Sequence, residues 1–253
     1  MAIDMRWRIH HKGRPDLDLP PAFRLVALRE KNRAFEHAQE IAAKEGAGTL
    51  VWVGRFDLVE FAVVLEPDEP LAAARRIIYA GMNALADTLA IHAPPETLIS
   101  FEWPDALFVD GGLVGGGHIA WPKGCEENMR PDWLVFGAML RTVILGNIEP
   151  GLKPHLTALE DAGFSGLEPG RLVETFSRHF LATINTWQQD GFASIAKSYL
   201  LRLPVTNGAQ HLIDGDGNLR TRKKGSTEVN RRRLRRELAN PSWFDPESGE
   251  IYL

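Results

Sequence analysis

The residues best suited to ligand binding lie in one short stretch, FEWPDALFVDGGLVGGGHIAW, which spans residues 101–121. Three consecutive glycines, Gly115, Gly116 and Gly117, precede His118 there. A glycine run leaves the main chain bare, so a ligand or another chain segment can come close to it. His118 could add a contact at the same place, because its imidazole can donate or accept a hydrogen bond. The alternative is a bent strand that needs small residues, with His118 packed at its end.

A tight hairpin is predicted to position this glycine run. The residues LFVD favour a strand, and residues 114–121 return as its partner. Between them, Asp110-Gly111-Gly112 supplies the positive-φ positions that a two-residue turn requires. Because glycine weakens a strand interior, the run also predicts a β-bulge or a close approach of main chains.

Strands and helices are expected on both sides of the hairpin. We expect Asn32 to cap the first helix, and the helix after Pro70 has apolar residues at 3.6 spacing. Glu60, in an apolar strand, would need a partner if it faces inward, and Arg55 is the candidate. The predicted strands are residues 23–27, 49–53, 59–65 and 133–143, and the predicted helices are residues 32–44, 70–90, 155–163 and 169–203, with a further short helix from about residue 227.

The composition is that of a soluble globular protein. The chain has 253 residues, of which 44% are hydrophobic and 25% are charged, which is enough for one large core and a small appended unit. No apolar run approaches the roughly 20 residues that span a bilayer, and the first residues lack the apolar block of a signal peptide. A single cysteine, Cys125, agrees with a reducing compartment. We therefore expect a cytoplasmic protein without a membrane partner.

The net charge of −4 conceals a basic segment at residues 220–236, which contains nine Arg or Lys residues and one acidic residue. Such a segment can indicate nucleic-acid binding, but no aromatic residue is interleaved for base stacking. A solvated face or contacts with the acidic main domain are expected instead, and a nucleic-acid partner is not. No metal is expected either, because the histidines lack ligand spacing and the Asp214-Asp216-Asn218 pattern fits a β-turn better than a calcium loop.

Residues 101–121 resemble the core motif of the biotin-protein and lipoate-protein ligase superfamily. In that motif a Trp-Pro-Asn-Asp strand, a turn and a lysine-bearing strand form the floor of the acyl-adenylate site, and Trp103 and Pro104 match it directly. The resemblance runs from about Leu25 to the C-terminus in the family's order. Further stretches that resemble the family are residues 131–140, 174–203 and 211–222.

The resemblance implies an α+β fold with a mixed, largely antiparallel sheet and helices on one side, as in class II synthetases and biotin ligases. A ligase-like domain would span residues 21–203, after an irregular lead-in at residues 1–20, and a small C-terminal β-domain would span residues 209–253. It implies ATP and biotin or lipoate as ligands, a small carboxylic acid or acyl group as substrate, and a biotin- or lipoate-accepting carrier domain as partner. The ligand-binding residues expected on this basis are Asn32, Trp103, Asp105, Gly115, Gly116, Gly117 and His118.

The chain also departs from the family's pattern. Leu113 stands at the position of the lysine that binds the carboxylate and the α-phosphate, and Asp105 and Ala106 replace the Asn-Asp pair. Only residues 54–57 stand where the family has a long Gly- and Arg-rich loop over the adenylate. In place of Ser-Thr-Asn at the first helix, only Asn32 is retained.

These departures remove positive charge from a site where two anions must meet. The cations that could replace it are Arg29, Lys31, Arg55 and Lys123, each of which could also be a solvated surface cation. Two functions therefore remain open. One is a divergent ligase or acyltransferase, and some acyltransferase members pass the acyl group through a cysteine. Cys125, however, lies in an expected polar turn and is followed by two acidic residues, so a plain loop cysteine is expected. The other is a non-catalytic relative that binds an acyl group, a nucleotide or a carrier domain.

Overall fold

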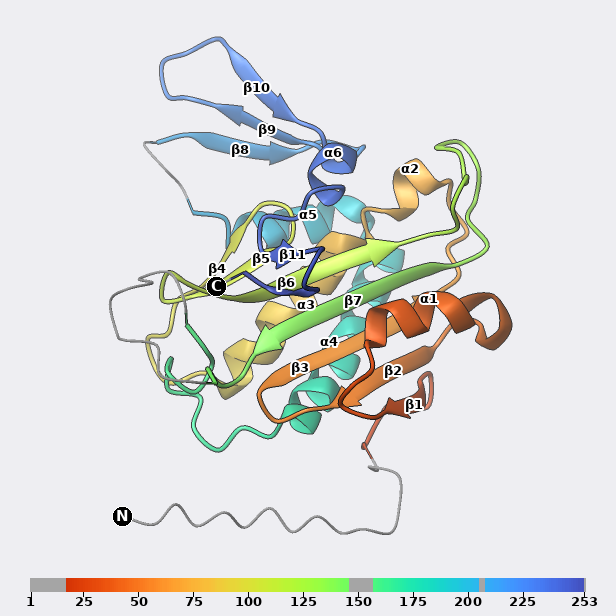
Figure 1. The fold of residues 1–253 in the computed structure, drawn as a ribbon. Coiled ribbons are helices and arrows are strands. Elements are labelled where there is room, and N and C mark those ends of the chain that lie inside the picture. The colour runs from red at the N-terminus through yellow and green to blue at the C-terminus, as the bar shows by residue number, and fades with distance from the viewer. Residues whose placement is uncertain (1–16, 146–156, 205–207, 253) are drawn as a thin grey trace.

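A seven-stranded sheet organises the protein (Figure 1). The computed structural model describes residues 17–145, 157–204 and 208–252. Strand order is β1-β2-β3-β7-β6-β5-β4; β1 and β2 are parallel, and all other neighbours in this sheet are antiparallel. The strands are β1 (Arg24–Leu28), β2 (Thr49–Gly54), β3 (Leu58–Leu65), β4 (Ile99–Glu102), β5 (Ala106–Val109), β6 (Gly112–Ala120) and β7 (Leu134–Arg141).

Helices cover both faces of this sheet. Leu50 and Trp52 of β2 face the large core beneath α3 and α4, whereas Val51 and Val53 face α1. Both faces of β2 are buried, which explains why its sequence is apolar throughout rather than alternating. The expected α+β class is confirmed, but the helices do not all lie on one side as expected, because α1 covers the face opposite the other long helices. These helices are α1 (Ala34–Glu45), α3 (Ile77–His92), α4 (Pro169–Asp190) and α5 (Phe192–Leu200).

Several predicted helices have different bounds. The helix expected over residues 169–203 is broken at Gly191, whose φ of 78° ends α4 before α5 begins. The helix expected from Pro70 divides into α2 (Leu71–Ala74) and α3. Residues 157–163 are irregular or in turns rather than helical, and residues 155–156 lie outside the described residues. The short helix begins at Leu234, not near residue 227, because β10 (Val229–Arg232) first pairs with β9 (Leu219–Arg222).

The hairpin of β5 and β6 has the predicted turn and the predicted bulge. Asp110 and Gly111 have φ values of 49° and 81°, as a two-residue turn of type I′ requires. Leu107 pairs with Gly115 and Phe108 with Leu113, so one extra residue stands on β6 between the two pairs. Gly115 has a φ of 151°, and a Cβ there would lie 1.9 Å from the carbonyl oxygen of Met139. Only glycine fits this position.

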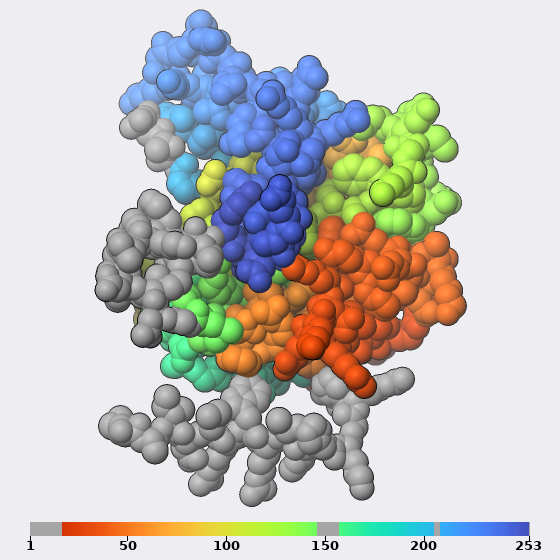
Figure 2. Space-filling model, in the orientation of Figure 1, coloured from red at the N-terminus to blue at the C-terminus, as the bar shows by residue number. Residues whose placement is uncertain are grey.

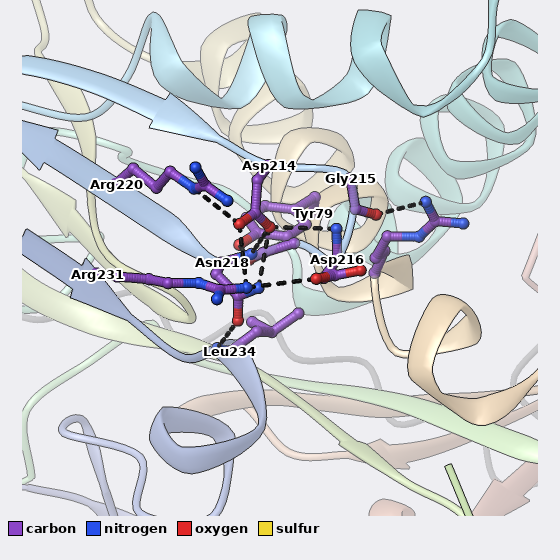
Figure 3. A network of polar contacts seen from close by, with 10 residues as sticks. Tyr79, Asp214, Gly215, Asp216, Asn218, Arg220, Arg231 and Leu234 are labelled. Atoms are coloured by element: carbon purple, nitrogen blue, oxygen red, sulfur yellow. Dashed lines mark hydrogen bonds and ion pairs between the residues drawn. The ribbon is translucent and has the colours of Figure 1, made fainter. Parts of the chain in front are cut away.

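A small three-stranded sheet consists of β8 (Gln210–Ile213), β9 and β10; β8 contacts α5, and the β8–β9 turn contacts α3. In the β8–β9 turn, Asp214 accepts main-chain N–H groups of Asp216 and Asn218 and pairs with Arg220 and Arg231 (Figure 3). The hydroxyl of Tyr79 donates to the Gly217 carbonyl at 2.5 Å. This is the predicted β-turn. Within the described residues, no group of three potential metal ligands is present.

The basic segment makes contacts within the chain, as expected. Besides the two arginines bound to Asp214, Arg232 pairs with Glu237 at 2.6 Å and Arg235 with Glu127 at 3.1 Å. Glu127 lies between β6 and β7, so this pair joins the basic segment to the part of the chain that carries the seven-stranded sheet. A separate observation concerns membranes: none of the described helices is long and apolar enough to cross one.

The last residues return to the main sheet rather than to the small one. Residues 243–252, here called the C-terminal arm, contain β11 (Phe244–Asp245) and β12 (Glu250–Ile251), which pair with each other. The arm follows α6 (Leu234–Leu238) and packs against residues of β3, β5 and β7. Figure 2 shows its dark blue atoms at the surface, next to the red-orange atoms of the N-terminal part of the chain. Trp243 and Ile251 are buried there against Leu58, Ala106 and Met139.

Candidate functional site

The glycine run is lined by side chains on both faces of the sheet. Trp243 of the C-terminal arm is fully buried, and a Cβ on Gly116 would lie 2.6 Å from its ring. On the opposite face, a Cβ on Gly117 would lie 3.0 Å from the ring of Phe136. The predicted close approach to the main chain is therefore confirmed, but the approaching group is the chain's own indole. The space beside Gly116 is occupied by Trp243.

His118 lies under the same arm and is packed between aromatic rings. Its imidazole stacks on Phe35 with ring centroids 3.6 Å apart and meets Trp243 and Phe244 edge-on at 5.6 and 5.5 Å. Burial lowers the pKa of His118 to about 3, so the ring is neutral near pH 7. Its Nε2 atom has no hydrogen-bond partner among the described residues. The ligand contact predicted for His118 would therefore use this free nitrogen.

Asp105 is the most unusual group on this face. Its side chain is buried, and neither carboxyl oxygen has a hydrogen-bond partner in the described part of the chain. Burial raises the pKa of Asp105 to about 8, and the nearby indole of Trp243 offsets this only in part, since the two groups do not reach hydrogen-bond geometry. Below that pH the carboxyl is protonated and can donate a hydrogen bond. Asp105, Gly116 and His118 are thus brought together beneath Trp243.

Trp103, predicted to bind ligand with them, lies on the other face. Its side chain belongs to the core beneath α3, and its indole N–H donates to the Tyr79 hydroxyl at 2.7 Å. The guanidinium of Arg232 lies over the outer side of the same ring, 5.0 Å from its centroid. The structure therefore places Trp103 between the main domain and the small sheet, away from Asp105.

Asn32 does not cap α1. The N-cap residue is Arg33, and the Asn32 amide instead donates to the Arg29 carbonyl at 3.1 Å. The buried carboxylate of Glu60 takes the capping role from β3, since it accepts the N–H of Ala34 at 2.7 Å. Burial raises the pKa of Glu60, and this N–H opposes the effect. The partner expected for Glu60, Arg55, pairs with Asp57 at 2.6 Å.

Two arginines that the sequence did not single out approach this face. Arg141, at the end of β7, is 7% exposed and donates to the carbonyl oxygens of Ile251 and Tyr252, each at 3.1 Å. Arg33 donates to the carbonyl oxygens of Ser248 and Gly249. A pocket of about 300 Å³ lies between these arginines. It is lined by residues that include Arg33, Arg55, Leu58, Met139, Arg141 and Glu250.

The other predicted cations lie at the surface. Arg29 and Lys31 are exposed between β1 and α1, and Lys123 is exposed in the turn after β6. Arg141 could have been recognised as the one charge in the otherwise apolar strand LVFGAMLR. Nothing local distinguishes Arg33, because its acceptors lie more than 200 residues further along the chain.

Cys125 is half-buried in the turn that follows β6. Its Sγ atom lies 3.7 Å from the Glu126 carbonyl oxygen and 3.8 Å from that of Met129. Both contacts are to main-chain oxygens of the same turn. The loop position is therefore the interpretation that its contacts favour.

Comparison with known proteins places this geometry in a family. The profile of the biotin/lipoate A/B protein ligase family matches residues 19–201. A biotin–[acetyl-CoA-carboxylase] ligase from Paracoccus denitrificans is 24% identical over 173 residues, which is 67% of this chain and 70% of the relative.

Solved structures agree with this match. A biotin protein ligase-like protein of unknown function from Silicibacter sp. aligns with a TM-score of 0.73 and 26% identity, over 85% of this chain and 96% of that one. Biotin protein ligase from Aquifex aeolicus, in complex with biotin and ATP, has the same fold, with a TM-score of 0.60 and 14% identity over 83% of this chain and 98% of that one. Because the family profile covers most of the sequence, the chain belongs to the biotin/lipoate A/B protein ligase family.

Proposed function

We propose that the protein binds a small carboxylic acid or acyl group, of the biotin or lipoate type, on the α1 face of its sheet over β6 and β7. The relatives support this substrate class, because one is named a biotin ligase and another forms a complex with biotin and ATP. The partner that such a protein would serve is a biotin- or lipoate-accepting carrier domain.

One observation supports this location for the site: an apolar surface of the sheet borders on a buried arginine. Leu58, Ala106 and Met139 form the floor. At its edge, a guanidinium nitrogen of Arg141 lies 3.5 Å from the carbonyl oxygen of Leu113, the position at which the resemblance expects a lysine. No described strand of the seven-stranded sheet carries a lysine. A guanidinium binds a carboxylate through two parallel hydrogen bonds, so Arg141 can hold the acid group while the floor contacts its apolar body.

Two activities follow from this arrangement. In the first, Arg141 replaces the lysine as the cation that brings the acid and the α-phosphate of ATP together. A carboxylate oxygen then attacks the α-phosphorus, the bond to the β-phosphate breaks with release of pyrophosphate, and the product is an acyl-adenylate. In the second, the protein binds the acid or its carrier domain without chemistry. The second is favoured by the β2–β3 turn, which has only residues 55–57 between its strands and in which Asp57 already neutralises Arg55.

Titration calorimetry with biotin, lipoate and octanoate tests the binding site, and pyrophosphate release from ATP separates the two activities. We expect at least one acid to bind, with release of pyrophosphate only if the ligase activity is retained. Acyl-carrier donors extend the test to an ATP-independent transferase, for which Cys125→Ser is the informative variant. The proposal is wrong if no acid binds at millimolar concentration, either to the natural chain or to Trp243→Ala, in which the site is uncovered.

A further inference from the structure

We infer that the C-terminal arm occupies the acid site in place of the ligand and is displaced when the acid binds. This inference rests on the proposed function and adds two statements to it. The ligand is a carboxylic acid whose apolar body replaces Trp243 and whose carboxylate replaces main-chain oxygens of the arm. Access to the site is controlled by the arm.

The first support is that carbonyl oxygens of the arm accept the hydrogen bonds of the Arg33 and Arg141 guanidinium groups. Among the described residues, the Arg33 side chain donates only to carbonyl oxygens of the arm. Arg141 donates to two more of them and to the carbonyl oxygens of Leu113 and Thr157. A carboxylate accepts stronger, charge-assisted hydrogen bonds from a guanidinium than a neutral carbonyl does. The arm also brings a carboxylate, Glu250, to the wall of the same pocket. An acid can therefore compete for the positions that the arm now holds.

The second support is a group of buried polar atoms beneath the arm that lack hydrogen-bond partners. Both carboxyl oxygens of Asp105, Nε2 of His118 and Nε1 of Trp243 are buried without a hydrogen-bond partner among the described residues. Buried polar groups in native proteins are nearly always paired, so such a cluster under one segment requires an explanation. The side chain of Asp105 is 1% exposed and faces the indole that covers it. The Trp243 indole lies near enough to Asp105 to lower its pKa but does not reach hydrogen-bond geometry, so a ligand with polar groups of its own could pair better with Asp105 and His118.

The third support is that the arm can leave without disrupting the sheet. Its own ladder has two residue pairs, Phe244 with Ile251 and Asp245 with Glu250. The floor beneath it is held independently by the six pairs that join β6 to β7. Segments with few backbone pairs open locally at a lower free-energy cost than the core of a sheet. Displacement therefore requires only the contacts of residues 243–252 to break.

Hydrogen exchange on the full chain tests the inference directly. The amides of Tyr252 and Gly249 are bonded within the arm, to Trp243 at 2.9 Å and to Asp245 at 2.7 Å. With octanoate, lipoate or biotin at a concentration that saturates the site, we expect both amides to exchange about tenfold faster or more. The amides of β8 and β9 should not change. Unchanged or slower exchange in the arm while the acid is bound would overturn the inference and leave the proposed function standing.

A pair of variants provides the second measurement. Trp243→Ala weakens the arm's hold, so we expect the acid to bind about tenfold more tightly, because a larger fraction of the protein is then open. Leu234→Ala is the control: it removes a buried side chain from α6, in the same C-terminal region, and should leave the affinity unchanged. If Trp243→Ala and the natural chain bind the acid with equal affinity, the arm does not compete with the acid and the inference is wrong. Absence of acid binding in both overturns the proposed function, and the inference falls with it. If Trp243→Ala does not fold, exchange in the natural chain decides alone.

Discussion

The indole of Trp243 lies against the main chain of Gly116, at the place where a side chain would otherwise stand. The two residues are 127 positions apart, and the contact joins the last segment of the chain to the central hairpin. A methyl group on Gly116 would meet this ring at 2.6 Å and the Asp105 carbonyl oxygen at 2.2 Å. The glycines of β6 therefore have two structural roles: Gly115 permits the β-bulge, and Gly116 leaves room for the indole of Trp243.

Gly115→Ala should be strongly destabilising. Its φ of 151° is strained for any residue with a side chain, and its Cβ would overlap a main-chain oxygen of β7 that cannot move without breaking the sheet. We expect a loss of about 3 kcal/mol or more in the free energy of unfolding, measured by urea titration. Gly111→Ala is the matched control, because its φ is also positive but its Cβ would meet no atom of the described residues within 4 Å; about 1–2 kcal/mol is expected there. Similar losses in both variants would contradict the steric argument.

Glu60→Ala, a substitution in β3, should destabilise the N-terminus of α1. The substitution leaves the buried N–H of Ala34 without its acceptor and removes a favourable charge from the start of the helix. The expected loss is about 1–3 kcal/mol, measured by chemical denaturation. Glu60→Gln keeps an acceptor oxygen and should cost clearly less. A glutamine variant as unstable as the alanine variant would show that the negative charge, rather than the hydrogen bond, matters.

The burial of Asp105 predicts a characteristic dependence of stability on pH. Its pKa is raised from 3.8 in the unfolded chain to about 8 in the folded protein, mainly by burial. The folded state therefore binds more protons between these values, and the contribution of Asp105 to stability is full below about pH 4 and is lost as the pH rises toward 8.

Asp105→Asn removes this dependence. We expect the variant to gain stability relative to the natural chain as the pH increases from 5 to 8, with a slope approaching roughly 1.4 kcal/mol per pH unit. Urea titrations at three pH values within this range measure the slope. A difference between the two proteins that does not change with pH would mean that Asp105 is ionised in the folded state.

Arg141→Met should weaken binding of the acid. The loss of a charge-assisted pair of hydrogen bonds is expected to reduce the affinity roughly 10- to 100-fold in titration calorimetry. Arg24→Met is the control, because Arg24 is the other arginine of the sheet but lies on the edge strand β1 and pairs with Glu45. The cations that the sequence suggested, Arg29, Arg55 and Lys123, are tested in the same way. If one of these variants loses affinity for the acid and Arg141→Met does not, the acid binds elsewhere than at β7.

Much of the fold could be predicted from local patterns. The turn at Asp110-Gly111 and the bulge at Gly115 depend on backbone conformations that glycine or aspartate adopt readily, so the residue types themselves indicate them. The break at Gly191 was missed, because a glycine inside a helical pattern is compatible with either a continuous helix or an end. Asn32 fits the usual pattern of an N-cap, but Glu60 supplies the acceptor from another strand, and no local rule reveals such a partner.

The sequence by itself determined the hairpin, the α+β class and the resemblance to acid-activating proteins, because strand propensity, turn chemistry and motif order are encoded in neighbouring residues. Only the tertiary structure decided what lies on the glycine strand. Arg33 meets Gly249 and Arg141 meets Ile251 across separations of 216 and 110 residues. Such contacts depend on how the whole chain packs, so no spacing in the sequence could show that the C-terminal arm covers Asp105 and His118.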